Sequence, residues 1–168
     1  MPYQVSYVQG EINFEALPVA KITKYPLEKA DYKPYAQCCI CAGPQGFSLR
    51  MWAFEVFASA ESEILASLGV VENSPDELLI RVIGDNPVRV EASVGGVPVE
   101  VQSQPHNGED LQGVYWGAQI FVPYTAEMVP IKPGVSFPGN FYKRRTDKPR
   151  EHTGSYTEGM DIFEVVSW

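Results

Sequence analysis

Cysteine is scarce in this chain, and long hydrophobic runs are missing from it. The 168 residues include three cysteines, which lie within four positions at Cys38, Cys39 and Cys41. Near-adjacent cysteines on a strand do not easily bridge, and no distant partner exists, so a disulfide framework is excluded. A zinc site usually needs a second pair of cysteines, which favours three buried thiols here. No window holds the roughly 18 apolar residues that a membrane helix requires.

The start of the chain also lacks the features of a secretory signal. Its first five residues have neither a basic start nor an apolar run. Together with the unpaired cysteines, this predicts a cytoplasmic protein, because thiols stay reduced in that compartment. Because no segment is apolar enough for a membrane helix, we also expect no contact with a membrane.

Positive charge is in the minority and is unevenly spread. The chain has 13 Lys and Arg residues against 21 Asp and Glu residues, for a formal net charge of -8. A strongly acidic chain is repelled by phosphate backbones, so we expect no nucleic-acid partner. Residues 132–151 nevertheless contain six cations and two anions, whereas residues 51–77 contain six acids and no Lys or Arg. Both segments fit solvated loop faces, but the first also fits a surface that grips a polar or acidic ligand.

Motifs of the common enzyme classes are missing as well. The sequence holds no G-x-S-x-G, P-loop, H-E-x-x-H or glycine-rich dinucleotide motif. Its two histidines, His106 and His152, lie in polar segments, and the adjacent acids Glu109 and Asp110 are its best pair for acid–base work. Neighbouring acids in a loop are commonly just solvated. We therefore expect a protein that is not an enzyme.

What the sequence does contain is a series of short strands. Hydrophobic residues make up 45% of the chain, which also has 14 prolines, and alternating segments are separated by turn signals about every ten residues. About eight or nine such strands are typical of a β-sandwich. We predict one all-β domain over residues 1–168, an antiparallel β-sandwich of jelly-roll or immunoglobulin-like type with at most one or two short helical turns. After one or two strands before residue 35, the predicted strands are residues 36–42, 47–56, 78–83, 88–94, 97–101, 114–122 and 160–168.

The pattern also predicts how some strands connect. Residues 36–56 read as a hairpin and residues 78–101 as a meander, because each contains turn residues between alternating segments. Residues 58–68 fit either a helical turn or a loop followed by a strand. Residues 102–112 are polar and residues 124–138 are broken by prolines, so we expect both to be mostly loop.

The densest cluster of ligand-binding chemistry is residues 139–156, predicted as a loop. Phe137-Pro138-Gly139 should force a turn before it, and Asn140 tolerates unusual backbone angles. Sugar rings have an apolar face and a rim of hydroxyls, so they need a flat aromatic surrounded by polar groups such as amides, carboxylates and cations. The residues that fit this description are Tyr142, Asn140, Lys143 and Arg144. The alternative is a loop that plugs the end of the sandwich, with Phe141 buried and the cations solvated.

Arginine and tryptophan on predicted strands offer a second binding surface. Arg50 and Trp52 share one strand face, and Arg81 lies on another strand. An arginine beside a large aromatic on the polar side of a strand is the composition of a binding platform, but it is also an ordinary cation–π contact. Trp116 alternates in phase with hydrophobic neighbours, so we expect it in the core.

Several of these residues belong to stretches that resemble a known family. The matching stretches are Phe137-Pro138-Gly139-Asn140-Phe141-Tyr142-Lys143, His152-Thr153-Gly154-Ser155-Tyr156, and Tyr32-Lys33-Pro34 before the strand Phe47–Glu55. They resemble carbohydrate-binding-module family 9-like domains, which are antiparallel β-sandwiches related to the DOMON superfamily and found in many bacterial proteins. Tyr156 stands where the family more often has Trp. The resemblance implies a non-catalytic domain that binds a glycan.

The resulting prediction is a glycan site near the C-terminal segment. Trp52 and Tyr142 would offer stacking faces, and the polar side chains would form hydrogen bonds with hydroxyls. We expect no cofactor and no metal, because nothing in this sequence supports the calcium sites known in the family. The ligand and the oligomeric state are left open. The predicted ligand-binding residues are Arg50, Trp52, Arg81, Asn140, Tyr142, Lys143, His152 and Tyr156.

Two other functions remain open. One is a structural or protein-interaction β-sandwich without sugar binding, in which residues 139–156 pack against the sandwich end or a second subunit. The other is a small sugar-active hydrolase or lyase that uses His152 or His106 with Glu109 or Asp110. That reaction needs a histidine and a carboxylate within hydrogen-bond reach of one cleft.

Overall fold

The fold is built almost entirely from β-strands. The computed structural model describes residues 3–25, 35–56, 58–110, 113–148 and 150–167, which form thirteen strands and one short 3-10 helix. No helix in these ranges is long and apolar enough to cross a membrane. The elements are β1 (Tyr3–Tyr7), η1 (Phe14–Ala16), β2 (Ala20–Ile22), β3 (Tyr35–Ala42), β4 (Gly46–Phe54), β5 (Ser62–Leu68), β6 (Leu78–Ile83), β7 (Arg89–Val94), β8 (Val97–Pro98), β9 (Gln102–Asp110), β10 (Gly113–Pro123), β11 (Ser136–Arg145), β12 (His152–Ser155) and β13 (Asp161–Ser167).

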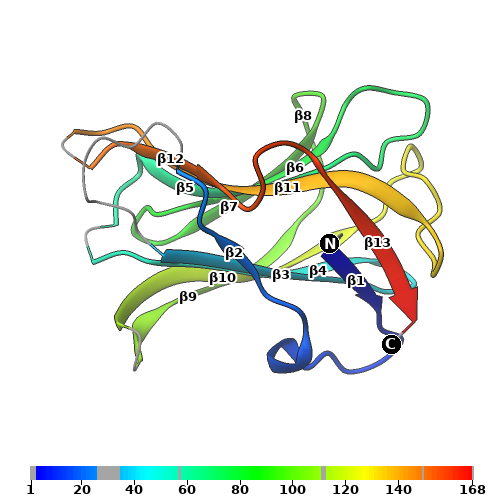
Figure 1. Cartoon of the computed structure of the whole chain (residues 1–168), viewed down its shortest axis with the longest axis horizontal. Coiled ribbons are helices and arrows are strands. Elements are labelled where there is room, and N and C mark those ends of the chain that lie inside the picture. The colour runs from blue at the N-terminus through cyan, green and yellow to red at the C-terminus, as the bar shows by residue number, and fades with distance from the viewer. Residues whose placement is uncertain (1–2, 26–34, 57, 111–112, 149, 168) are drawn as a thin grey trace.

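The strands form one continuous hydrogen-bonded sheet that folds into two layers (Figure 1). The order is β8-β7-β6-β5-β11-β13-β1-β3-β4-β10-β9, with β12 added to β11 and β2 added to β3. In Figure 1, β5, β6, β7, β11 and β12 form the upper layer, and β2, β3, β4, β9 and β10 the lower one. The all-β sandwich prediction is confirmed.

Strands β1 and β13 join the two layers along one side (Figure 1). Strand β13 pairs antiparallel with β11 of the upper layer, whereas β1 pairs parallel with both β13 and β3. These two parallel pairs depart from the purely antiparallel sandwich that the sequence pattern predicts. They bring the first and last described strands of the chain side by side.

Most of the predicted local connections are confirmed. Strands β3 and β4 form the expected hairpin, and β6, β7 and β8 form the expected meander, although β8 ends at Pro98. Of the two alternatives for residues 58–68, the loop followed by a strand is correct, because β5 covers Ser62–Leu68. The stretch Tyr32-Lys33-Pro34 lies outside the described residues.

Residues 102–112 were expected to be loop, and this is wrong for Gln102–Asp110, which form strand β9. Strand β9 is at the edge of the lower layer and, among the described strands, pairs only with β10. Most of its described side chains are exposed, so neither of its faces needs the alternating hydrophobic residues from which a strand is usually recognised.

Residues 137–145 were expected to turn and then form a loop, and this is also wrong, because they lie within strand β11. This strand is paired on both sides, with β5 along one edge and with β13 and β12 along the other. Gly139 is needed here for space, since a Cβ on it would lie 2.9 Å from the ring of Phe163. Pairing and packing from distant segments therefore override the local turn signal of Pro138-Gly139.

The space between the layers is filled by one large hydrophobic core. Its aromatic centre includes Phe141 and Phe163, whose ring centroids are 5.4 Å apart. Trp116 is 3% exposed, which confirms its predicted place in the core. The three cysteines are buried and free, as the sequence predicts.

Candidate functional site

The structure places the predicted ligand-binding residues in separate environments. Arg50 and Trp52 lie on the outer face of the lower layer, and Arg81 and Tyr142 on the outer face of the upper layer. Asn140, Lys143 and His152 are buried, and Tyr156 packs against the core. These side chains therefore do not line one common cleft.

The side chain of Asn140 connects residues 157–159 to strand β11 through hydrogen bonds. Its side-chain Nδ2 donates hydrogen bonds to the carbonyl oxygens of Thr157 (3.1 Å) and Gly159 (2.8 Å). Its Oδ1 accepts from the backbone N–H groups of Phe141 (2.8 Å) and Thr157 (3.2 Å). Both amide hydrogens are thus used within the protein, which gives Asn140 a structural role in holding residues 157–159.

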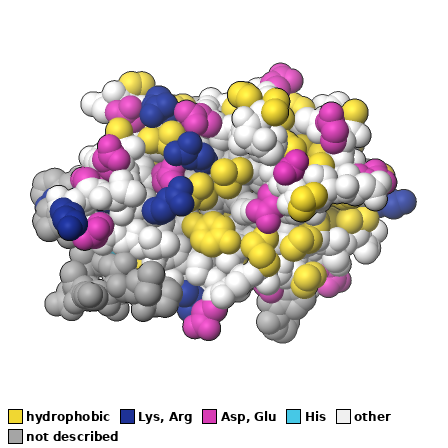
Figure 2. All heavy atoms as spheres, turned by 90° about the horizontal axis from the view of Figure 1, so that it is seen from above, with side chains coloured by type: hydrophobic (Ala, Val, Ile, Leu, Met, Phe, Trp, Pro, Cys, Tyr) yellow, Lys and Arg dark blue, Asp and Glu magenta, His cyan; other side chains and the backbone are white. Residues whose placement is uncertain are grey.

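The outer face of the upper layer carries a network of paired charges. Glu63 accepts hydrogen bonds from Arg81 Nη2 at 2.6 Å and from Arg144 Nε at 2.9 Å. Burial alone would raise the pKa of Glu63, but the hydrogen bonds from both arginines outweigh burial and lower it. Figure 2 looks onto this layer and shows dark-blue cations lying among magenta acids. Of the cations counted in residues 132–151, Arg144 is therefore paired here with an acid from a strand distant in the sequence.

The outer face of the lower layer carries a stack of side chains. The Arg50 guanidinium carbon lies 4.5 Å from the ring centroid of Trp52, and Tyr115 stacks on Trp52 at 4.7 Å with an interplanar angle of 15°. Arg50 precedes Trp52 by two residues on β4, and Tyr115 directly precedes Trp116, which lies opposite Ala53. The indole of Trp52 is thus in contact with both Arg50 and Tyr115. A sugar that stacked on the indole face covered by Tyr115 would have to displace that ring.

At one end of the sandwich interior the core is ionic rather than apolar. The carboxylate of Glu55 is fully buried, and its Oε2 lies 3.4 Å from Lys143 Nζ and 3.2 Å from Arg145 Nη1. Its Oε1 accepts hydrogen bonds from Ser62 Oγ at 2.6 Å and from Trp116 Nε1 at 3.2 Å. Both carboxylate oxygens are therefore satisfied, as a buried charge requires. We call Glu55, Ser62, Lys143, Arg145 and His152 the ionic cluster.

Lys143 and His152 share a hydrogen bond whose direction can be assigned. His152 Nδ1 lies 2.7 Å from the carbonyl oxygen of Arg150, which can only accept, so Nδ1 carries the proton. Nε2 therefore accepts from Lys143 Nζ at 2.9 Å. Burial and the charge of Lys143 lower the pKa of His152 to about 4. Burial also lowers the pKa of Lys143 to about 8, although the carboxylate of Glu55 opposes this shift.

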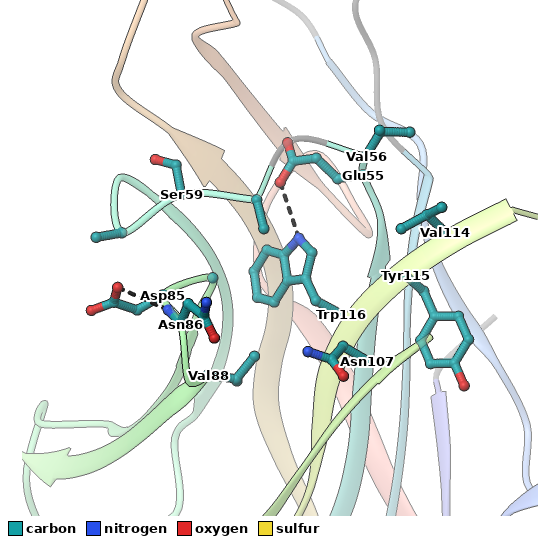
Figure 3. Close-up of a pocket in the computed structure, with 13 residues that line it drawn as sticks. Glu55, Val56, Ser59, Asp85, Asn86, Val88, Asn107, Val114, Tyr115 and Trp116 are labelled. Carbon is teal, nitrogen blue, oxygen red and sulfur yellow. Dashed lines mark hydrogen bonds between the residues drawn. The ribbon is translucent and has the colours of Figure 1, made fainter. Parts of the chain in front are cut away.

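An open cleft lies at the same end of the sandwich, next to Glu55 (Figure 3). It has a volume of about 530 Å³ and is formed by the segment after β4, the β6–β7 turn and strands β9 and β10. Figure 3 shows Trp116 at its back, with Asn86 on one side, whereas the ring of Tyr115 points away from the indole. Gly84 allows the β6–β7 turn to pack against the indole, since a Cβ there would lie 3.0 Å from the Trp116 ring. We call this the end cleft.

The walls of the end cleft combine apolar surface with hydrogen-bonding groups. The apolar part comes from Val56, Val88, Val114, Tyr115 and Trp116. Asp85 is partly engaged, because it accepts a hydrogen bond from Arg89 Nε at 3.2 Å. The side-chain amides of Asn86 and Asn107 make no hydrogen bond to any residue that the structure describes. The cleft therefore offers two free amides beside an aromatic wall.

Sequence reasoning missed the residues of the end cleft. Asp85-Asn86-Pro87 was interpreted only as a turn, and residues 102–112, which include Asn107, as loop. One signal was present in the strand pattern. The inward positions of β4 are hydrophobic from Phe47 to Ala53, and the next position in the same phase is Glu55. An acid at an inward position next to a strand end indicates a buried partner of opposite charge.

Metal binding gains no support from the geometry. Among the described residues, no group of three or more His, Cys, Asp or Glu side chains is placed to hold a metal ion. His106 lies on the outer face of the lower layer, with its ring centroid 6.5 Å from that of Trp52, whereas His152 is in the interior. The two histidines therefore do not share a site.

Comparison with known proteins identifies the fold. No protein-family model and no curated protein matches the chain. Among solved structures, a family 9 carbohydrate-binding module from Caldicellulosiruptor kristjanssonii in complex with cellotriose matches with a TM-score of 0.70 and 11% identity, over 100% of this chain and 95% of that one. A second structure with the same description, in complex with glucose, matches with a TM-score of 0.70 and 10% identity, over 100% of this chain and 97% of that one.

A third solved structure gives the same result. A putative carbohydrate-binding protein from Bacteroides uniformis matches with a TM-score of 0.70 and 15% identity, over 96% of this chain and 97% of that one. The chain therefore has the fold of the family 9 carbohydrate-binding modules, as the sequence resemblance implied. The relation to the DOMON superfamily stays a prediction.

Proposed function

We propose that this chain is a non-catalytic carbohydrate-binding domain and that the end cleft holds the sugar. The fold supports the ligand class, because structures with the same fold were solved with glucose and cellotriose. The observation that carries the location is the pair of free amides of Asn86 and Asn107 beside the aromatic wall of the end cleft.

The chemistry of the end cleft suits a sugar. A primary amide has two donors and an acceptor, so it can bind neighbouring hydroxyls at the same time. The apolar wall, with Val88 and Val114, would contact the C–H face of a ring. The cleft volume of about 530 Å³ lies within the range of roughly 300–1,000 Å³ that is common for small-molecule sites.

The ionic cluster would support the end cleft without contacting the ligand directly. Glu55 accepts the Trp116 indole N–H at 3.2 Å, and Lys143 and Arg145 hold Glu55. In this proposal Lys143 and His152 are positioning residues that fix the back wall. Contacts of Arg81, Asn140, Tyr142 and Tyr156 with a sugar stay predictions. The occupied hydrogen bonds of Asn140 make it the weakest candidate among them.

A double variant of the end cleft tests the proposal. Asn86→Ala with Asn107→Ala should weaken binding of the best sugar in a glycan screen by about fivefold or more, because two hydrogen bonds are each worth about 0.5–1.5 kcal/mol. Isothermal titration calorimetry measures the affinity, and thermal unfolding checks that the fold is intact. Gln4→Ala is the matched control, because Gln4 is an exposed amide on β1.

Two results would overturn the proposal. If the double variant binds as tightly as the wild type, the site is elsewhere on the domain. If the folded wild-type protein binds nothing in the glycan screen, with or without calcium, the structural or protein-interaction function is favoured instead.

A further inference from the structure

A shallow trough crosses the outer face of the lower layer, away from the end cleft. It consists of two adjoining hollows of about 310 Å³ and 300 Å³ that share Ile12, Ser48 and Phe121. One hollow lies between the η1 segment and edge strand β9, and the other continues towards the β3–β4 turn. We call the two hollows together the face trough.

The strand register explains which side chains face the trough. On the outer face, Phe121 of β10 lies opposite Ser48 of β4 and Gln102 of β9. One step along, Gln119 lies opposite Gln104. Because alternate residues of a strand point to the same face, these side chains form neighbouring rows across three strands. The result is an aromatic ring at the floor with amides on the side of β9.

The polar groups of the face trough are free to bind a ligand. The side chains of Gln102, Gln104 and Gln119 make no hydrogen bond to any residue in the described ranges. Gln102 and Gln104 are exposed, and Gln119 is half-buried. Three amides on one sheet face can satisfy many hydroxyls in a row, since each has two donors and an acceptor.

The lining of the face trough is also uncharged. None of the residues that line the two hollows is Asp, Glu, Lys or Arg. Arg50, which lies opposite Gln119 on this face, is paired with Glu15 at 3.0 Å. An acidic polymer or a phosphate would find no cation in the trough to bind, whereas a neutral polyhydroxyl chain needs none. The trough is open towards edge strand β9, so a long ligand can pass over it.

We propose that the face trough is a second carbohydrate site, which takes a linear, neutral polysaccharide across β4, β10 and β9. Ile12 and Phe14 form one wall, Phe121 offers apolar surface at the floor, and the glutamine amides bind the hydroxyls. The proposal shares the ligand class of the proposed function but not its site. The end cleft suits a short sugar or a chain end, and the face trough suits the middle of a chain.

Affinity electrophoresis through gels that contain a soluble polysaccharide tests the face trough. The probes are hydroxyethylcellulose, mixed-linkage β-glucan, glucomannan and, as an acidic control, polygalacturonate. We expect at least one neutral polymer to slow the wild-type protein. The double variant Gln104→Ala with Gln119→Ala should weaken that retardation about fivefold or more, whereas Gln4→Ala should not change it. Thermal unfolding confirms that each variant is folded.

The same measurement on the end-cleft variant distinguishes binding at the two sites. In the Asn86→Ala/Asn107→Ala variant, retardation by the neutral polymer should persist if the face trough binds it, even if the end cleft proves not to be a sugar site. The second-site proposal is wrong if the trough variant is retarded as much as wild type, or if polygalacturonate retards the protein equally. It is equally wrong if no polymer slows the protein. Binding of a peptide along the edge of β9 would instead survive both glutamine changes.

Discussion

The interior of this sandwich differs between the two ends of the same pair of strands. At one end, Phe47 of β4 faces Phe137 of β11, with ring centroids 6.0 Å apart. At the other end, Glu55 at the end of β4 faces Lys143 of β11. Both ends are buried, but aromatic side chains fill the first and paired charges fill the second. The end cleft opens at the second.

The difference shows what each end contributes. Burying apolar side chains is favourable in itself, at about 25 cal/mol for each Å² removed from water. Burying ions costs free energy that their mutual attraction repays only with good geometry. The ionic cluster therefore adds little to the stability of the fold. It fixes the geometry of the end cleft instead, because the hydrogen bond between Glu55 and Trp116 holds the back of the cleft in place.

The largest difference between the two ends is expected when the carboxylate of Glu55 is removed. Glu55→Ala leaves Lys143 and Arg145 buried without their shared partner, so we expect a loss of about 3–5 kcal/mol in the free energy of unfolding. Urea denaturation measures it. Replacing both Glu55 and Lys143 with Met should recover part of the loss, since an apolar pair of similar volume can substitute for an ion pair. An unchanged unfolding midpoint in Glu55→Ala would contradict the role given to the ionic cluster.

The matching change at the apolar end should cost somewhat less. Leu49 is fully buried, and Leu49→Ala should lose about 2–4 kcal/mol through lost burial and the cavity left behind. In contrast with Glu55→Ala, no double replacement is expected to rescue it. The end cleft should keep its sugar affinity in this variant, measured by calorimetry below the unfolding temperature. A selective loss of affinity would show that the two ends are coupled.

The pH dependence of stability should separate the two ends more finely. The pKa of His152 is lowered from 6.5 to about 4 in the fold, so the unfolded chain binds a proton first, and stability falls as the pH drops from 6.5 to 4. For this one group we expect a loss of about 1–2 kcal/mol between about pH 7 and pH 5. His152→Gln should flatten that part of the curve, and Leu49→Ala should not.

Lys143 should also make the stability of the fold increase with pH, but in the alkaline range. The pKa of Lys143 is lowered from 10.5 to about 8 in the fold. Between these two pH values the unfolded chain keeps a proton that the folded chain has lost, so stability increases as the pH rises from 8 towards 10.5. Urea denaturation of the wild type and of Lys143→Met across this range measures the effect. Curves of equal slope in the two proteins would argue against a buried, hard-to-charge Lys143.

The smallest effect is expected from an ion pair on the surface. Glu15 pairs with Arg50 at 3.0 Å, but its side chain is 79% exposed. Glu15→Gln should therefore change the free energy of unfolding by no more than about 0.5 kcal/mol. The same denaturation experiment checks it, and a loss comparable to that of Glu55→Ala would show that burial is not what distinguishes the two pairs.

The strands with clear alternation could be predicted from the sequence, and so could the inward place of Trp116. Strand β9 could not, because an exposed edge strand needs no hydrophobic residues. The burial of Lys143 could not be predicted either. Its partner Glu55 is 88 residues away, and a sequence shows three adjacent cations but not which of them points inward. The end cleft was missed for the same reason, since it is assembled from segments far apart in the chain.

The position of β1 has a consequence for how this chain folds. Its residues Tyr3–Tyr7 pair with Phe163–Ser167 of β13, so the contact that joins the two layers spans almost the whole sequence. Contacts of such long separation form slowly, because a large loop must be closed before any bond repays the entropy. During synthesis, β1 has to wait for β13 before the layers can be joined on that side. We therefore expect slow folding that is completed only after β13 has been synthesised.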